Sequence, residues 1–236
     1  MSVFSTTLRL RNKDVNLHRR LRTAMLFELM QEASIRHTEE LGMGREMTLD
    51  RGLLWMVTHQ QAEIERMPAY DERITLESWP GKTMHLLFPR FYRVLDEQGQ
   101  VLLRASSLWA LVDERTRRMV FPDRHGVVIE GVETGGEIAL PSSVRRAAEG
   151  ERHDFTVPFS YVDLNGHMNN TRYFDLAEDL LPAAAEGRQL RRAAVEYASE
   201  ARLGDRLTVT TEESGGSFFI SGDNEKKIFR LMLEYR

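Results

Sequence analysis

The stretch FTVPFSYVDLNGHMNNTRYFDLAEDLL, residues 155–181, joins an apolar, strand-like run to a helix-like run through a polar loop. The apolar run is Phe155–Phe159, and positions 163–170 of the loop hold an acid, an imidazole and three carboxamides. Asn170 suits a helix N-cap, because its side-chain oxygen can accept from the free amides of the first turn. The stretch therefore predicts a polar cluster at a helix N-terminus, where free N–H groups and the helix dipole favour developing negative charge.

The same order of elements occurs twice along the chain. In the first half the sequence predicts strands over 3–11, 53–65, 73–79, 84–95 and 101–112 and a helix over 22–40, and in the second half strands over 152–161, 190–200, 205–213, 216–222 and 227–235 and a helix over 171–186. Two local matches in the same order support a duplication: residues 14–18 (DVNLH) with 163–167 (DLNGH), and 72–76 (ERITL) with 205–209 (DRLTV). A sheet of this kind buries its apolar face against the helix of its own unit. We therefore expect an α+β fold of two fused domains, each an antiparallel sheet wrapped around a long central helix.

Composition bounds the class of protein. The chain has 236 residues, enough for one large or two small domains, and its net charge of −4 argues against a general nucleic-acid binder. It contains no cysteine, which excludes disulfides, thiolate metal sites and a cysteine nucleophile. No signal-peptide pattern opens the sequence and no apolar run is long enough to span a membrane. We expect a cytoplasmic protein that does not bind membranes.

The polar loop has structural as well as chemical interpretations. Asn and Asp commonly hydrogen-bond their own backbone in turns, so a turn with a helix cap is about as favoured as a reactive site. A calcium loop is disfavoured because its twelfth position is Phe174, where a bidentate Glu is needed. One His with one Asp also makes a poor zinc site, so we expect no metal.

Two further features have ordinary explanations beside functional ones. Glu196 and Glu200 fall at alternating positions, on one face of the strand predicted over 190–200, and are either solvated or, if they face the polar loop, functional.

No Gly-x-Ser-x-Gly elbow surrounds a serine, so the sequence offers no serine nucleophile of that type. Basic pairs are either surface charge or, taken together, a docking patch for an acidic partner. They are Arg19-Arg20, Arg117-Arg118, Arg145-Arg146 and Arg191-Arg192.

The second half contains the motifs Asp163-x-Asn165-x-His167-x-Asn169-Asn170-x-x-Tyr173 and Val195-Glu196-Tyr197-x-x-Glu200. The first half contains residues 29–34 (LMQEAS), 63–68 (EIERMP), 77–81 (ESWPG) and 105–113 (ASSLWALVD). Through these motifs the sequence resembles the acyl-acyl-carrier-protein (acyl-ACP) thioesterases of the plant and bacterial type, which consist of two fused hotdog domains. The resemblance covers most of the chain. It implies an N-terminal hotdog domain over 1–133, a linker over 134–150 and a C-terminal hotdog domain over 151–236.

The resemblance also implies the site. The catalytic residues of the family correspond to Asp163, Asn165, His167 and Glu200. Where the plant enzymes have a cysteine beside the glutamate, this chain has Ala201, so a carboxylate must act as the base. We expect Glu200 to activate water with His167, Asn165 to hold the water or the carbonyl, and Asp163 to order the network.

Secondary roles follow for other residues. Backbone N–H groups of Met168, Asn169 and Asn170 are expected to face the oxyanion. The first half keeps Asp14, Asn16 and His18 but has Met67-Pro68 in the region of Glu200, so we expect it to be catalytically silent. Its helix face at Met25 and Leu29 is expected to shape an acyl-chain pocket.

The expected function is hydrolysis of acyl-ACP to free fatty acid, with acyl carrier protein as partner and no cofactor. Acyl-CoA hydrolysis on the same fold and a non-catalytic acyl-binding module are the alternatives. Direct attack by Asp163 or Glu200 to form an anhydride is an alternative to water attack. A homodimer is compatible with the sequence.

Overall fold

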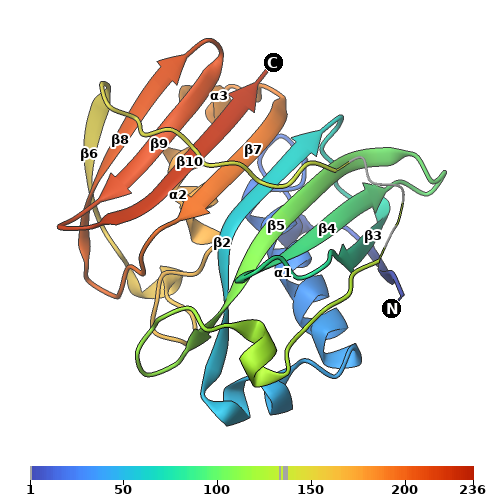
Figure 1. Cartoon of the computed structure of the whole chain (residues 1–236). Helices are drawn as coiled ribbons and strands as arrows, with labels where there is room; N and C mark the ends of the chain where they lie inside the picture. The colour runs from blue at the N-terminus through green and yellow to red at the C-terminus, as the bar shows by residue number, and fades with distance from the viewer. Residues whose placement is uncertain (1, 133, 135–137) are drawn as a thin grey trace.

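Within the residues that the computed structural model describes (2–132, 134 and 138–236), ten strands form one antiparallel sheet with the helices on one face (Figure 1). The strands of the first half are β1 (Phe4–Arg9), β2 (Leu53–Ile64), β3 (Arg73–Pro80), β4 (Leu87–Leu95) and β5 (Val101–Asp113). Those of the second half are β6 (Glu151–Thr156), β7 (Leu190–Tyr197), β8 (Arg206–Ser214), β9 (Ser217–Asp223) and β10 (Lys227–Tyr235). All ten predicted strands are present, with boundaries that differ by a few residues.

The two halves have the same strand order. The sheet runs β1-β3-β4-β5-β2-β7-β10-β9-β8-β6, so each half reads first, third, fourth, fifth and second strand from its outer edge to the centre. The halves join where β2 pairs antiparallel with β7, from His59 opposite Glu196 to Glu63 opposite Arg192. The repeated order that the sequence predicts is therefore present in the sheet topology.

Helix α1 (Thr23–Glu40) confirms the helix predicted over 22–40. Its buried residues include Ala24, Phe27 and Met30, which recur every three residues and place one face against the sheet. Met25 and Leu29 are half-buried and pack against the main hydrophobic cluster. The first half thus covers its strands with one long helix.

The second helix is shorter than the sequence analysis expects. Instead of one helix over 171–186, α2 (Arg172–Asp179) ends before Pro182, and α3 (Pro182–Ala185) begins there. A proline has no N–H to continue the helix and its ring clashes with the preceding turn, whereas the first helical position tolerates it. The predicted cap is also wrong: the N-cap of α2 is Thr171, not Asn170, and it makes no side-chain cap hydrogen bond. Asn169 Oδ1 accepts from Thr171 N at 2.9 Å in the turn before the helix.

The segment between the halves lies against the sheet. Residues 135–137 of the predicted linker over 134–150, and residue 133 at the end of the first predicted domain, lie outside the described residues. Residues 138–150 cross the face opposite the helices (Figure 1), where Val144 N donates to Glu196 Oε2 and Ala147 N to Ser221 Oγ. Because this segment covers one face and the helices the other, most of β10 is buried on both sides.

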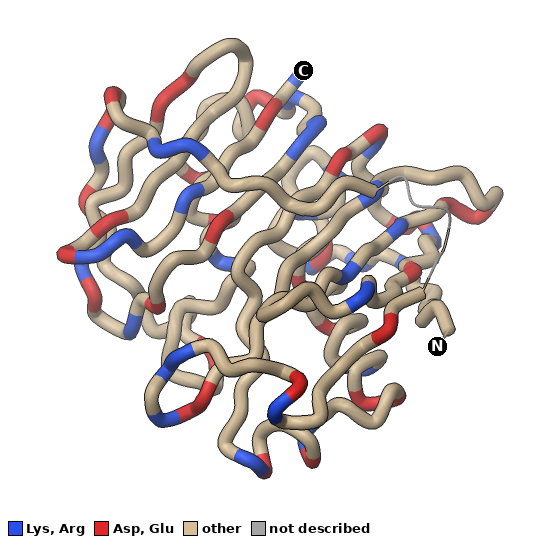
Figure 2. Tube along the Cα trace, in the orientation of Figure 1, with Lys and Arg blue, Asp and Glu red and all other residues tan. Residues whose placement is uncertain are grey.

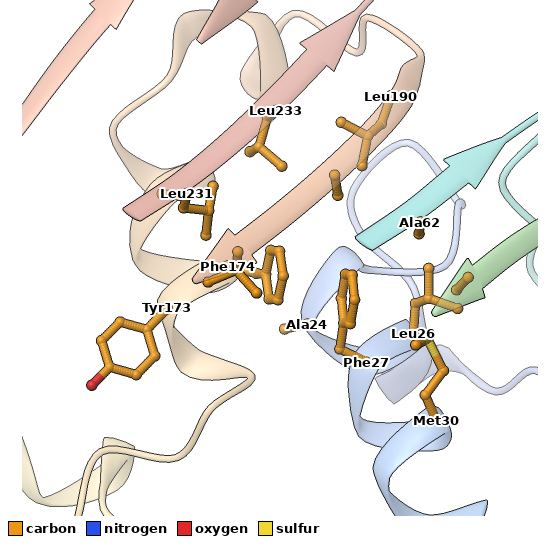
Figure 3. Close-up of a cluster of buried hydrophobic side chains, with 14 of the residues drawn as sticks. Ala24, Leu26, Phe27, Met30, Ala62, Tyr173, Phe174, Leu190, Leu231 and Leu233 are labelled. Atoms are coloured by element: carbon orange, nitrogen blue, oxygen red, sulfur yellow. The ribbon is translucent and has the colours of Figure 1, made fainter. Parts of the chain in front are cut away.

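The core continues across both halves. Phe27 of α1 and Phe174 of α2 stack with ring centroids 4.1 Å apart and planes within 5° (Figure 3). Such a pair adds about 0.5–1.5 kcal/mol to the free energy gained from burial alone. The two helices are therefore joined through the cluster that also packs on the central strands. No helix in the described part of the chain combines the length and apolar character needed to cross a bilayer.

Candidate active site

The polar loop is a tight turn that its own backbone closes. Asp163 N donates to His167 O at 2.9 Å and Gly166 N to Asp163 O at 3.0 Å. The Asp163 carboxylate accepts from Asn165 N at 2.8 Å, which is the turn chemistry that Asp favours. Gly166 has φ +79°, a conformation that glycine adopts without strain. Asp163 therefore shapes the loop, and the amide side chain of Asn165 stays available.

His167 and Glu200 lie side by side. Met168 N donates to Ala201 O at 2.7 Å, and a β-bridge pairs His167 with Arg202. These bonds hold the loop against the segment after β7, so that His167 Nε2 lies 3.1 Å from Glu200 Oε2. The two side chains are 17% and 24% exposed, which leaves both reachable from solvent.

The structure corrects the position of Glu200. Strand β7 ends at Tyr197, and the N–H groups of Ala198 and Ser199 both donate to Ile228 O. Two residues opposite one acceptor form a bulge that ends the regular alternation. Glu196 and Glu200 therefore do not share a strand face: Glu196 pairs with Lys227 and lies under the segment 138–150, whereas Glu200 faces His167.

The second oxygen of Glu200 binds a residue from the other half. Arg117 Nη2 donates to Glu200 Oε1. Arg117 belongs to the turn after β5 and has φ +57°, a left-handed conformation that an arginine rarely adopts. The carboxylate is thus shared between a guanidinium and an imidazole. Sequence reasoning noted the Arg117-Arg118 pair but had no signal for this contact, because it joins turns 83 residues apart.

The expected oxyanion donors are largely occupied. Met168 N donates to Ala201 O and Asn169 N to Tyr161 O at 2.8 Å, so neither is free to face a substrate. Asn170 differs, since its N–H has no acceptor among the described residues, while its carbonyl accepts from Tyr197 Oη at 2.8 Å. Burial raises the pKa of Tyr197 well above its usual value, so the phenol remains a donor. Asn165 and Asn170 are the remaining candidates for binding a carbonyl oxygen.

A cavity of about 300 Å³ opens beside the loop. Asp163, Asn165 and Asn170 line one side of it. The other walls come from the second half of α1 and from the strands behind it, with Ile35, Leu54, Trp55, Phe88 and Trp109 as large apolar members. Met25 and Leu29 do not line this cavity, because they lie nearer the start of α1 and face the main cluster instead. The part of α1 that lines the cavity lies instead within residues 31–39.

Comparison with known proteins decides the family. The acyl-ACP thioesterase N-terminal domain matches residues 1–122, and the acyl-ACP thioesterase C-terminal domain matches residues 144–235. The chain belongs to the acyl-ACP thioesterase family. A chloroplastic acyl-[acyl-carrier-protein] hydrolase of Cuphea viscosissima is 26% identical over 223 residues, covering 88% of this chain and 54% of that protein. A chloroplastic dodecanoyl-[acyl-carrier-protein] hydrolase of Cinnamomum camphora is 27% identical over 231 residues, covering 91% and 60%.

Solved structures of acyl-ACP thioesterases have the same fold. The enzyme of Bacteroides thetaiotaomicron superposes with a TM-score of 0.88 at 21% identity, covering 99% of this chain and 98% of that one. The 12:0-ACP thioesterase of Umbellularia californica gives 0.82 at 25% identity, covering 99% and 97%. The chain spans somewhat over half the length of the curated relatives it matches, and nearly all of these crystallised chains.

In this acyl-ACP thioesterase family member, Asn16 and His18 of the first-half loop (residues 14–18) hydrogen-bond to the backbone. Asn16 Oδ1 accepts from His18 N at 3.0 Å and from Arg20 N at 3.1 Å. His18 Nε2 lies 3.0 Å from Ala185 O, and a Cβ on Gly187 would come within 2.7 Å of the His18 ring. Met67, the residue in the region of Glu200, is half-buried against the core. The histidine of this loop therefore faces a backbone carbonyl rather than an acid.

Two further observations concern the charged and metal-ligating side chains. Basic and acidic residues are interspersed along the trace (Figure 2), and Arg117, Arg145 and Arg191 each pair with a different carboxylate, so these three basic pairs are not purely basic surface. Among the described residues, no three His, Asp or Glu side chains are grouped closely enough to hold a metal ion.

Proposed function

We propose that the chain hydrolyses acyl-ACP thioesters and releases free fatty acid. The observation that carries the proposal is the contact between Glu200 Oε2 and His167 Nε2 at 3.1 Å. His167 belongs to the loop whose Asn165 and Asn170 line the cavity of about 300 Å³, although His167 and Glu200 are not among the lining residues of that cavity. Membership of the acyl-ACP thioesterase family supports the substrate class. The curated relatives named as acyl-ACP hydrolases support it as well.

The proposed reaction uses water as the nucleophile. Glu200, paired with His167, accepts a proton from water while the water oxygen attacks the thioester carbonyl carbon. Asn165 and the Asn170 N–H donate to the carbonyl oxygen as it gains negative charge. The tetrahedral intermediate then breaks its C–S bond, and the leaving thiolate takes the proton back, so that a fatty acid and a thiol are the products. Removal of a general base costs about 10²–10⁴ in rate.

Arg117 has a positioning role in this scheme. Because its guanidinium holds Glu200 Oε1, the other carboxylate oxygen is directed toward His167. Arg117 lies in the first half and Glu200 in the second, so the site needs both halves even though one supplies the proposed catalytic groups. We infer that the halves are two fused hotdog domains, 1–133 and 151–236, because they share one strand order around α1 and α2.

The test is product analysis on a series of acyl-ACP substrates of increasing chain length. Fatty acid release well above the buffer rate is expected, with loss on Glu200→Ala and little change for Glu196→Gln, a glutamate of the same sequence motif. Comparison with acyl-CoA of one chain length identifies the carrier. Absence of release from every substrate would overturn the proposal, and tight acyl binding without release would instead indicate an acyl-binding module.

A further inference from the structure

A second cavity, of about 570 Å³, lies between the first-half loop and helices α2 and α3. Asn16, His18, Leu180 and Ala184 are among its lining residues. Its volume is within the range of about 300–1,000 Å³ typical of small-molecule sites. The proposed hydrolysis makes no use of it.

The second cavity corresponds to the first through the internal duplication. Each is formed by a loop of one half and the helical region of the other. Lining residues correspond in pairs 149 residues apart, Asn16 with Asn165, Gln31 with Leu180, and Ile35 with Ala184. Met67, in the region matching Glu200, also lines the second cavity. The second cavity thus adjoins a loop that has no counterpart of Glu200, which suits binding without hydrolysis.

Part of the wall of the second cavity is aliphatic. Leu21, Met67, Leu180, Leu181, Ala184 and Leu190 are among its apolar lining residues. Burial of each methylene group of a ligand against such a surface contributes about 0.8 kcal/mol, or about fourfold in affinity. The walls therefore favour a ligand with an alkyl chain.

Several charged residues around the cavity are paired with a partner of opposite charge. Asp175 is neutralised by Arg22 at 2.5 Å and by Arg172 at 2.8 Å. Arg66 binds Glu72 through both of its terminal nitrogens.

Four further charged groups lie around the cavity. Glu178 accepts from Thr23 Oγ1 at 2.6 Å, and burial raises its pKa to about 7, which weakens its negative charge. Asp179 is exposed at the edge. Arg20 donates to the Gly187 carbonyl at 2.9 Å, and neither Arg20 nor Arg188 has a carboxylate within 4.0 Å among the described residues. These two arginines are therefore available to an anionic group.

We propose that the cavity between the first-half loop and helices α2 and α3 binds a fatty acid, with its carboxylate at Arg20 and Arg188 and its chain along the aliphatic wall. The choice of a fatty acid as ligand rests on the proposed function, of which it is the product. The site would then hold the product between the first-half loop and helices α2 and α3, away from the proposed catalytic residues.

Calorimetric titration of the full chain with dodecanoate tests the proposal. Ala185, an exposed lining residue at the end of α3, is replaced by tryptophan to fill the cavity mouth. Ala148→Trp is the matched control, since Ala148 is exposed in the segment on the opposite face of the sheet. Hydrolysis of acyl-ACP is measured in parallel, so failure of the proposed function is recorded separately from failure of binding.

The expected result is a class of dodecanoate sites that Ala185→Trp weakens at least about tenfold and Ala148→Trp leaves unchanged, with hydrolysis retained in both. From octanoate to dodecanoate the affinity of this class should rise about fourfold for each methylene. The double variant Arg20→Gln/Arg188→Gln should weaken dodecanoate about tenfold and leave dodecanol unchanged. Equal titrations of Ala185→Trp and the unmodified chain would overturn the proposal. So would dodecanol binding as tightly as dodecanoate, or no binding of dodecanoate at all.

Discussion

Two loops with one sequence pattern, residues 14–18 and 163–167, occupy corresponding places in the two halves and have different surroundings. In the second, Asp163 closes the turn, Asn165 keeps its amide free, and His167 lies 3.1 Å from Glu200. In the first, Asn16 closes the turn and His18 lies 3.0 Å from the Ala185 carbonyl. The same three residue types therefore make different contacts according to the partner that the rest of the fold supplies, which supports the proposed catalytic role for the second loop and a structural role for the first.

The largest effect should come from the acid that only the second loop has. Glu200→Ala removes the proposed base, and the expected loss in kcat for acyl-ACP hydrolysis is about 10²–10⁴. Met67→Ala, in the corresponding region of the first half, should retain kcat within about threefold. If the kcat values of the two variants lay within threefold of each other, the proposed catalytic difference between the two loops would be contradicted.

The histidines give the next test. His167→Ala should lower kcat about 10²-fold, because Glu200 loses the imidazole that shares its proton. His18→Ala should leave kcat nearly unchanged but lower the free energy of unfolding by about 1 kcal/mol, the usual value of one hydrogen bond. Kinetics and urea denaturation of both variants measure the two effects. A larger kinetic effect at His18 than at His167 would assign the reaction to the first half and contradict the proposal.

Arg117 tests whether the first half acts on the site. Arg117→Ala leaves Glu200 Oε1 without its charged partner, and we expect kcat/KM to fall about tenfold, which equals about 1.4 kcal/mol. Arg118→Ala is the control, because Arg118 is the exposed neighbour in the same turn. If Arg117→Lys restored most of the rate, charge would suffice, whereas a continued deficit would show that the guanidinium geometry matters. An Arg117→Ala enzyme as active as the Arg118→Ala control would exclude the positioning role.

The two helical regions also differ at one titratable position, and this is the smallest expected effect. Glu178 of α2 corresponds to Leu29 of α1 through the 149-residue spacing, and burial raises the pKa of Glu178 from 4.5 to about 7. Between these values the folded chain keeps a proton that the unfolded chain has lost, so this group lowers stability as pH rises from about 4.5 to 7.

Replacement by glutamine isolates that contribution. Relative to the unmodified chain, Glu178→Gln should gain free energy of unfolding on going from pH 5 to pH 8, on the order of 1 kcal/mol because water reaches the cavity and screens the charge. Urea denaturation at the two pH values measures the difference. A difference that does not change with pH would show that Glu178 ionises as freely in the fold as in the unfolded chain.

Much of the fold is predictable from local sequence pattern, and the places where the structure differs from the prediction have physical causes. Helix α1 and all ten strands follow from apolar periodicity, which acts within a few residues. The helix predicted over 171–186 ends instead at Asp179, and Pro182 begins a separate short helix, because a proline cannot continue the helical hydrogen bonding but is tolerated at the first helical position. The segment 138–150 has no periodic pattern, yet hydrogen bonds to Glu196 and Ser221 attach it to the sheet. Such contacts join residues 52 and 74 positions apart and leave no local trace.

The amino-acid sequence by itself determined the duplicated order of elements, the absence of a thiol and the residue types gathered in the 163–170 loop. These follow from local propensity, period and composition. Only the tertiary structure decided that a bulge after Tyr197 turns Glu200 toward His167, that Arg117 crosses from the other half to the same carboxylate, and that two backbone amides expected for the oxyanion are already bonded. Each of these depends on which distant backbone groups become neighbours, and that is set by the packing of the whole sheet rather than by any single stretch of chain.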